Sequence, residues 1–542
     1  MSVFNLLSIQ VNFKFTAPQT VQLNQLDEWL NGVLQTPPVS ANTPATRPQK
    51  EPSDTQVGLM EAIQRLTTGV LQWAYFPVFD LPALATVQAG ESGVVTASLQ
   101  FPYRGAWPSA VYEQATSLAV KYLLWMNQNP VNDANKAALF ADIERSVLNA
   151  FRAQSGSGKS TLPVLRAAHA MGIPYRCLGA GVYQLGLGSQ ARRLDRSVCD
   201  GDSAIGAKLS QNKAVTANLL RMAGLPAPNH RVVGKAQDLP AVAQQLGFPL
   251  VVKPSDLDRG EGVVVDIVDE AALAAAFEQA VKLSPSKQAI VEQQVQGTCH
   301  RLFMFNGALL YAVKRRPMGV FGDGVNTVAQ LVGLALAEQA QLPPWARSEL
   351  KPLDEAAHAE LVRQNLTAES IPVQAQFVSL RRIESTRDGG VDEDVSAQIH
   401  PDNLDIACRA ARLFGLVVAG IDIITEDISK PWHHTGAIIN EVNFAPLLGG
   451  GDISRANLSR FLTALLPNKG LIPIERFAQD NFAGAQARHL ELLGTGARSV
   501  LLSSDCCTAA DGVNRVLTQR DLASRLWAVT MDATVDAVVV VG

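Results

Sequence analysis

Apolar and polar positions along the chain repeat with two different periods. In 109–127 and 135–154 the apolar side chains recur at spacings of three and four residues, the period of an amphipathic helix. Shorter apolar runs, FPLVVKP from Phe248 and AIVEQQV at 289–295, have the length of buried strands. Because helices and strands alternate from about Ser160, the sequence predicts a mixed α/β (α+β) fold.

Further strand signals lie in the second half of the chain. In RLFMFNGALLYAVKRR the pair Asn306-Gly307 separates two apolar runs, which is typical of a two-residue hairpin turn. The runs VVAGIDIIT (417–425) and AIINEVNF (437–444) predict two strands joined by a polar connection. A final strand is predicted over 537–541.

The length of 542 residues exceeds what one hydrophobic core usually supports, and 47% apolar residues can fill several cores. The segment 36–54, rich in Pro, Ser, Thr and charge, predicts an exposed loop within an amino-terminal domain. We expect three parts, at 1–160, 161–468 and 469–542.

Charge and targeting signals narrow the class of protein. The net charge is −4 and no long run of like charges occurs, so a nucleic-acid partner is not expected and a small molecule is favoured. No secretory signal pattern and no stretch of about 20 apolar residues is present, which predicts a cytoplasmic protein without a membrane span. The six cysteines lack paired metal-site spacing and are expected to be free thiols.

Two Gly-rich segments are candidates for holding a triphosphate. SGSGKST at 155–161 resembles a P-loop, but Ala153 replaces the first glycine of the full pattern and no clear strand precedes it. We interpret it as a turn before a helix. In the second, KPSDLDRGEGVVV, Lys253 ends a strand, and Gly260 and Gly262 lie in a polar loop that can cover phosphates. The alternative for this segment is an ordinary β-connection with a solvent-exposed lysine.

Three oxygen-bearing side chains form a candidate magnesium site. Glu441 and Asn443 are two residues apart on a predicted strand, so both leave one face. Asp422, inside the apolar run GIDII, can add a third ligand from the preceding strand. A buried aspartate is costly unless it is paired or bound to metal, so a structural salt bridge remains the alternative for Asp422.

In chain order, Lys213, VVKP with its Gly-rich loop, VEQQV, GIDII and NEVNFAP resemble the ATP-grasp superfamily. Within it, the segments DGDSAIGAKLSQNKAVTANLLRMAGLPAP, FGDGVNTVAQLV and QIHPDNLDIACRAARLFGLVVAGIDIIT resemble cyanophycin synthetases. The resemblance covers roughly 155–446 and implies an ATP-grasp fold, preceded by a mixed amino-terminal domain. His400, in QIHPDN, is interpreted as a hydrogen-bonding residue at a helix start rather than a base.

The resemblance also implies roles for individual residues. Lys213 and Lys253 would bind ATP phosphates under the Gly260 and Gly262 loop, and Asp422, Glu441 and Asn443 would hold Mg²⁺. The residues expected to border the adenine are Glu292, Gln293 and Val295. Arg301 and Arg315, with Lys253, would act on the reacting phosphoryl group, because preorganised charge stabilises an anionic intermediate. For both arginines the alternative is a solvated position on a strand.

The sequence departs from the family pattern at several positions. Cys299 replaces the acidic residue expected to contact ribose, and Leu447 replaces a glycine after NEVN-x-x-P. The segment LRRIESTRDGGVDEDV keeps Arg382 but adds Arg387, so these two arginines are candidates for substrate binding. No G-T-N-G-K-T phosphate loop follows, and 469–542 is expected to be a truncated, nucleotide-free Mur-ligase-like segment that packs or forms an oligomer interface.

Two functions remain open from the sequence. The first is an ATP-dependent carboxylate–amine ligase that acts through an acyl phosphate, forms ADP and phosphate, and uses an amino acid, dipeptide or peptide substrate. It is expected to be a homo-oligomer with ATP and Mg²⁺ as cofactors. The second is a weakly active or inactive ATP-binding scaffold that partners a full-length cyanophycin synthetase.

Overall fold

The computed structural model describes residues 7–34, 54–89, 93–105, 107–158, 160–257, 260–347, 350–382, 384 and 390–542. These residues divide between two compact units. The first comprises Met1–Arg196, Leu448–Gly450 and Leu458–Gly542, and the second comprises Ser197–Leu447 and Gly451–Asn457. The three predicted parts, at 1–160, 161–468 and 469–542, stay a prediction. Of the predicted loop at 36–54, all but the last residue lies outside the described residues.

The amino-terminal part of the first unit is an antiparallel sheet with helices. Its three strands lie in the order β1-β3-β2, and α1, α2 and α3 pack with one another, α3 also against β1. The bounds are β1 Ser8–Thr16, α1 Leu23–Val33, α2 Asp54–Trp73, β2 Ala83–Ala89, β3 Val94–Pro102 and α3 Ser109–Gln128. The helix predicted over 109–127 is thereby confirmed.

The helix predicted over 135–154 is present but not uniform. It begins as α4, Asp133–Ile143, continues as a π-helix at Glu144–Ala150 and ends as a 3₁₀ turn at Phe151–Gln154. Asn132 caps its start, since its side chain accepts a hydrogen bond from the backbone N–H of Asn135. Periodicity of apolar residues predicted a helix here, but it does not distinguish the winding of the last turns.

The rest of the first unit is α/β. It contains α5 (Thr161–Ala170), the antiparallel strands β4 (Tyr175–Gly179), β5 (Val182–Leu185) and β6 (Arg192–Asp195), α15 (Leu458–Leu465) and a four-stranded sheet of order β19-β22-β20-β21. The elements of that last part are β19 Ile474–Phe477, α16 Phe482–Gly494, β20 Ser499–Leu502, β21 Cys507–Thr508, α17 Leu522–Val529 and β22 Ala537–Val541. The strand predicted at 537–541 is confirmed.

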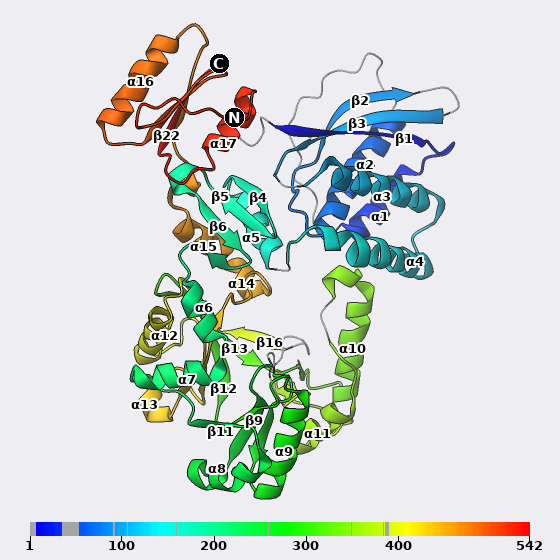
Figure 1. Ribbon diagram of the computed structural model, residues 1–542. Helices are drawn as coiled ribbons and strands as arrows, with labels where there is room; N and C mark the ends of the chain where they lie inside the picture. The colour runs from blue at the N-terminus through cyan, green and yellow to red at the C-terminus, as the bar shows by residue number, and fades with distance from the viewer. Residues whose placement is uncertain are drawn as a thin grey trace. The chain divides into compact units, whose positions relative to one another are not determined.

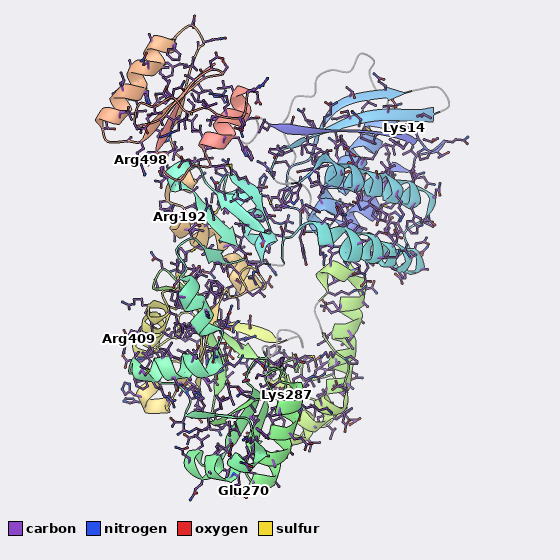
Figure 2. The ribbon with its side chains drawn as sticks, in the orientation of Figure 1. Lys14, Arg192, Glu270, Lys287, Arg409 and Arg498 are labelled. Carbon is purple, nitrogen blue, oxygen red and sulfur yellow. The ribbon has the colours of Figure 1, made fainter. Side chains whose placement is uncertain are left out.

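In the second unit, the first sheet has four strands in the order β10-β9-β11-β8. Helices α8 and α9 pack against it (Figure 1), and Glu270, labelled in Figure 2, is the first residue of α9. Apolar side chains from both helices form one core with Leu250, Val252 and Val291 of the sheet. The bounds are β8 His230–Val233, α8 Leu239–Leu246, β9 Leu250–Pro254, β10 Val264–Ile267, α9 Glu270–Leu283 and β11 Ala289–Gln293.

The second sheet of this unit has five strands in the order β16-β13-β12-β17-β18. They are β12 Thr298–Phe305, β13 Ala308–Arg316, β16 Val391–Asp394, β17 Val418–Thr425 and β18 Ile438–Phe444. The predicted hairpin is confirmed, because Asn306 and Gly307 both have positive φ, 49° and 74°, between β12 and β13.

Alternation along these strands separates a core face from a polar face. Leu302 on β12, Ile421 on β17 and Val442 on β18 share a core with α12 (Pro401–Leu413). The residues one position along, Arg301, Asp422 and either neighbour of Val442, therefore leave from the opposite face. The strand pattern thus places polar side chains together where α12 does not cover the sheet.

The remaining elements of the second unit are short sheets and helices. They are β7 Val198–Cys199, α6 Ala204–Ser210, α7 Lys213–Met222, β14 Gly319–Phe321, α10 Val328–Gln341, α11 Glu355–Arg363, β15 Phe377–Ser379, α13 Trp432–Thr435 and α14 Asp452–Ala456. The predicted mixed α/β class is confirmed by these elements. Across the part of the chain that the structure describes, no helix has the length and apolar character to cross a membrane.

Candidate active site

A row of charged side chains crosses the five-stranded sheet. Asp422 on β17 lies directly between Arg301 on β12 and Glu441 on β18 in the strand register. Arg301 Nε donates to Asp422 Oδ1 at 2.7 Å, and Arg301 Nη2 donates to Oδ2 at 2.6 Å. The Asp422 side chain is only 4% exposed. Such a bidentate pair fixes the carboxylate and compensates its charge in the sheet.

Asn443 completes this row from β18. Its Nδ2 donates to Asp422 Oδ2 at 3.2 Å and to the carbonyl oxygen of Gly420 at 3.3 Å. A Cβ at Gly420 would lie 3.4 Å from the Cβ of Asn443 and 3.5 Å from Cδ of Arg301. It would also lie 3.1 Å from the Cβ of Pro446, the one contact closer than ordinary van der Waals distance, so glycine here accommodates Pro446.

The four-stranded sheet carries a second polar group. Lys253 Nζ donates to Glu292 Oε1 at 2.8 Å, and both side chains are buried. Lys253 lies opposite Ile290, two residues from Glu292, so the pair spans β9 and β11 diagonally on one face. His230 on β8 is the register partner of Glu292, and burial lowers the pKa of its imidazole.

Lys213 lies close to residues from both sheets of the second unit. It lies at the first position of α7, where its Nζ donates to the carbonyl oxygen of Leu257 at 2.8 Å and lies 4.0 Å from Glu441 Oε1. Leu257 follows β9 and opens the loop that contains Gly260 and Gly262. Both glycines have positive φ, 75° and 72°, which suits a tight loop. Lys213, which is predicted to bind phosphate, thus contacts the residue that opens the predicted phosphate-binding loop and also lies close to Glu441, a predicted metal ligand.

Arg315 and Cys299 extend the polar face of the five-stranded sheet. Arg315 is half-buried on β13, opposite Asp392 and two residues from Val313, the register partner of Arg301. Cys299 lies two residues before Arg301. Burial and the nearby charge of Asp422 raise the pKa of the Cys299 thiol well above its usual value. Cys299 is therefore a protonated thiol at neutral pH.

The residues expected to border the adenine lie at the end of β11. Glu292 is buried, Gln293 is exposed and Val295 is half-buried just after the strand. The backbone N–H of Gln293 donates to Asn229 and that of Gln294 donates to Pro249, so the chain is held on both sides as it leaves the sheet. The predicted nucleotide-binding segment is thus held by backbone hydrogen bonds at the point where the chain leaves β11.

The two candidate substrate arginines have different positions. Arg382, an exposed residue shortly after β15, forms an ion pair with Asp266 of β10. Arg387 lies outside the described residues. Sequence reasoning did not identify Asp266 or His230 as part of this region. A polar residue within the apolar run GVVVDIV is the signal that would have indicated Asp266.

The donor set fits a hard divalent cation. Glu441 and Asp422 supply carboxylate oxygens and Asn443 an amide oxygen, the ligand types that Mg²⁺ prefers, with substrate phosphates completing its shell. Among the described residues, no group of three or more His, Cys, Asp or Glu side chains has the arrangement of a metal site. A cation here would depend on this mixed set of two carboxylates and one amide.

The other Gly-rich segment has different surroundings. A 3₁₀ turn, Phe151–Gln154, precedes it and α5 follows it, so no strand enters the loop as it does in a P-loop. Lys159 itself lies outside the described residues. His400 is the N-cap of α12 and its Nδ1 accepts from the backbone N–H of Asp402, as predicted for a structural residue. All six cysteines are free thiols.

Comparison with known proteins finds similarity to cyanophycin synthetases, although no family model matches the chain. The enzyme of Geminocystis herdmanii is 32% identical over 308 residues, 56% of this chain and 35% of the relative. That of Trichormus variabilis is 32% identical over 331 residues, 58% of this chain and 36% of the relative. The glutathione biosynthesis bifunctional protein GshAB of Mannheimia succiniciproducens is 32% identical over 257 residues, 46% of this chain and 33% of the relative.

The chain thus spans about a third of the length of these relatives. The predicted resemblance to cyanophycin synthetase is confirmed over that segment. Among solved structures, a bifunctional glutathione synthetase from Pasteurella multocida has a TM-score of 0.45 and 23% identity, covering 66% of this chain and 53% of that chain. A D-alanine–D-alanine ligase from Bacillus anthracis has a TM-score of 0.31 and 17% identity, covering 49% and 67% of the two chains.

Proposed function

We propose that this chain is an ATP-grasp ligase, an ATP-dependent carboxylate–amine ligase that joins amino acid or peptide building blocks through an acyl phosphate. The observation that carries the proposal is the position of Lys213, which contacts the loop after β9 and approaches Glu441 in the charged row of the other sheet. A triphosphate placed between the two sheets would contact the lysine ammonium groups. The carboxylate and amide oxygens of the charged row could then bind the Mg²⁺ ion that accompanies it.

The two lysines are assigned to the phosphates of ATP. Lys253 is held at the end of β9 by Glu292, so its ammonium is presented from a buried strand rather than from a flexible surface. Lys213 presents a second ammonium from the start of α7. Glu292, Gln293 and Val295 would border the adenine, where backbone groups leaving β11 can bind a base.

Asp422, Glu441 and Asn443 are assigned to Mg²⁺. When bound, the ion would draw negative charge from the phosphates and so favour attack on the γ-phosphorus. The chain's own contribution is to fix Asp422 through Arg301 and to keep Glu441, which is 31% exposed, accessible on the same face.

Arg301 and Arg315 are assigned to the anionic intermediate. Arg301 uses Nε and one N–H of Nη2 on Asp422, so three of its five N–H donors remain for a phosphate or carboxylate oxygen. Arg315, two residues from the partner of Arg301, can add charge on the same face. Preorganised cations of this kind stabilise the transition state because they need no reorientation during reaction.

The substrate class follows from the relatives and remains part of the proposal. Arg382, and Arg387 outside the described residues, would bind a substrate carboxylate, which favours amino acids or peptides such as aspartate–arginine dipeptides. We also propose that the protein acts in the cytoplasm as a homo-oligomer. The charged row itself favours catalysis over a scaffold role, since a scaffold has no need for these buried polar groups.

Purified protein incubated with Mg-ATP and a panel of amino acids, aspartate–arginine dipeptides and cyanophycin primers tests the proposal. ADP and phosphate that form only with a carboxylate and an amine present would support it. Binding of Mg-ATP without turnover on any member of the panel would instead support the scaffold. AMP and pyrophosphate as products would contradict an acyl phosphate route.

A further inference from the structure

Asp266 occupies an unusual backbone position in the four-stranded sheet. The pairing of β10 with β9 shifts register between Val264 and Ile267, and Asp266 within this irregularity has φ of 56°. Residues other than glycine rarely adopt a left-handed conformation, although Asp and Asn tolerate it best. A strained residue inside a strand persists where surrounding contacts hold it, and such positions gather at functional sites.

One side of Asp266 is bound to the turn after β11. Its backbone N–H donates to Gln294 Oε1 at 2.6 Å, and Gln294 Nε2 donates back to Asp266 Oδ1 at 2.7 Å. Gln294 lies between Gln293 and Val295, which are proposed to border the adenine. The reciprocal pair therefore fixes the bulge of β10 to the nucleotide-binding turn.

The other carboxylate oxygen of Asp266 is bound to two arginines. Oδ2 accepts from Nη2 of Arg382, after β15, and from Nη1 of Arg363, at the end of α11, the latter at 3.2 Å. Glu360, one turn earlier on α11, is buried, and burial raises the pKa of its carboxyl group. Both guanidinium groups thus form ion pairs with the one carboxylate of Asp266.

We propose that Asp266 is a positioning residue that couples the nucleotide-binding turn at Gln294 to the substrate arginine Arg382. The proposal rests on the proposed function, since it uses the roles assigned there to the turn and to Arg382. Nucleotide bound against 293–295 further restrains the Gln294 side chain, and the Asp266 carboxylate bonded to it then holds Arg382 in place for an acidic substrate. ATP and substrate binding are linked by one side chain.

The charge of Asp266 is consistent with this role. Burial favours its protonated form, but hydrogen bonds from Gln294 and Arg382 outweigh burial and lower its pKa. The carboxylate is therefore ionised at neutral pH. Because the contacts to Arg382 and Arg363 are partly exposed, each is individually modest. The coupling depends on the bonds of the Asp266 carboxylate to Gln294 and to Arg382.

Hydrogen–deuterium exchange with a non-hydrolysable ATP analogue and Mg²⁺ tests the coupling without requiring turnover. In the wild-type protein, the nucleotide should slow amide exchange in 289–295 and also, by about threefold, in 377–382, which belongs to a different element. Asp266→Asn keeps an oxygen for Gln294 but loses the charge facing Arg382. Gln294→Leu removes the link at the turn. Both variants should retain protection of 289–295 and lose it in 377–382.

Arg363→Gln is the matched control, because it removes a cation from the same oxygen without altering Arg382 or Gln294. This variant should keep the protection of 377–382. In turnover at saturating ATP, Asp266→Asn should raise KM for the carboxylate substrate by roughly five- to tenfold, whereas the Kd of ATP measured without substrate should change less than twofold. A purely structural role of Asp266 would change both the constant for the carboxylate substrate and the constant for ATP.

Three results would overturn the proposal. Protection of 289–295 in the wild type without any change in 377–382 would show that no coupling exists. Undiminished protection of 377–382 in both variants would show that Asp266 does not carry it. Absence of protection in 289–295 would contradict the proposed nucleotide site itself, and the coupling would then be wrong as well. Failure of the coupling alone is therefore distinguishable from failure of the proposed nucleotide site.

Discussion

Arg301 and Asp422 form a two-bond ion pair across adjacent strands of the five-stranded sheet, at 2.7 and 2.6 Å. The carboxylate is buried, whereas the guanidinium retains 21% of its side-chain exposure. Asp422 is thereby anchored in the sheet, whereas Arg301 keeps N–H donors available to a ligand. Both alternatives weighed for Asp422 from the sequence, a salt bridge and a metal ligand, are compatible with this geometry.

Replacement of Asp422 by Asn should destabilise the second unit and abolish metal-dependent nucleotide binding. The substitution leaves Arg301 partly buried without its counter-charge, at a cost of about 2 kcal/mol in free energy of unfolding. Urea-induced unfolding measures this cost. Arg455→Gln, which breaks an exposed pair with Asp452 in the same unit, is the control and should change stability by less than about 0.5 kcal/mol. Equal effects would contradict a special role for the Arg301 pair.

Lys253→Met should weaken ATP binding by at least about tenfold, because it removes a buried ammonium and a charge-assisted contact. Lys235→Met changes an exposed lysine shortly after β8 and should leave the affinity unchanged. Isothermal titration with Mg-ATP compares them. Lys159→Ala should also bind ATP normally, and loss of binding in that variant would instead favour the P-loop interpretation of SGSGKST.

Glu441→Gln should raise the Mg²⁺ concentration needed for half-maximal nucleotide binding, by roughly tenfold, since a neutral amide is a weaker ligand than a carboxylate. The same change removes the anion closest to the Lys213 ammonium in the charged row. Titration of nucleotide binding against Mg²⁺ measures the shift. Glu393→Gln, on the exposed edge strand β16, is the matched control. An unchanged Mg²⁺ requirement in Glu441→Gln would exclude Glu441 as a ligand.

Acid should weaken the carboxy-terminal part of the first unit through Asp536. Arg498 donates Nε to Oδ2 at 2.8 Å and Nη2 to Oδ1 at 2.9 Å, and these bonds lower the pKa of Asp536 below its usual range. A carboxyl with a depressed folded pKa stabilises the fold above its unfolded pKa of about 4, and this contribution is lost as pH falls further.

The thermal midpoint of the wild type should therefore exceed that of Asp536→Asn at pH 7, and the difference should shrink below about pH 4. A difference that stays constant between pH 7 and pH 3 would contradict the assignment. Nucleotide binding should be the same in both proteins at pH 7, because Asp536 lies in the other unit from the charged row.

Local patterns were sufficient to predict much of the second unit. Asn306-Gly307 specified a hairpin because both residues accept positive φ, and alternation in GIDII and NEVNF placed Asp422, Glu441 and Asn443 on one face. These inferences depend on residues close in sequence or on the two-residue period of a strand. The resemblance to cyanophycin synthetase then assigned them to one proposed site.

Contacts between distant segments were not predictable in this way. The bond from Lys213 to the carbonyl of Leu257 and the links of Asp266 to Gln294 and Arg382 join residues far apart in sequence. No periodicity specifies which side chains meet across separate elements. The π-helical stretch Glu144–Ala150 is likewise not specified by the spacing of apolar residues.

Transfer of oxygen from substrate to phosphate tests the central claim most directly. The panel of amino acids and dipeptides, labelled with ¹⁸O in their carboxylates, is incubated with the protein, Mg-ATP and amine acceptors. An acyl phosphate route predicts ADP, a new amide and one ¹⁸O atom in the released phosphate, because the attacking carboxylate oxygen leaves with phosphorus. Phosphate without label, label in AMP, or no product from any substrate in the panel would contradict the proposed ligase.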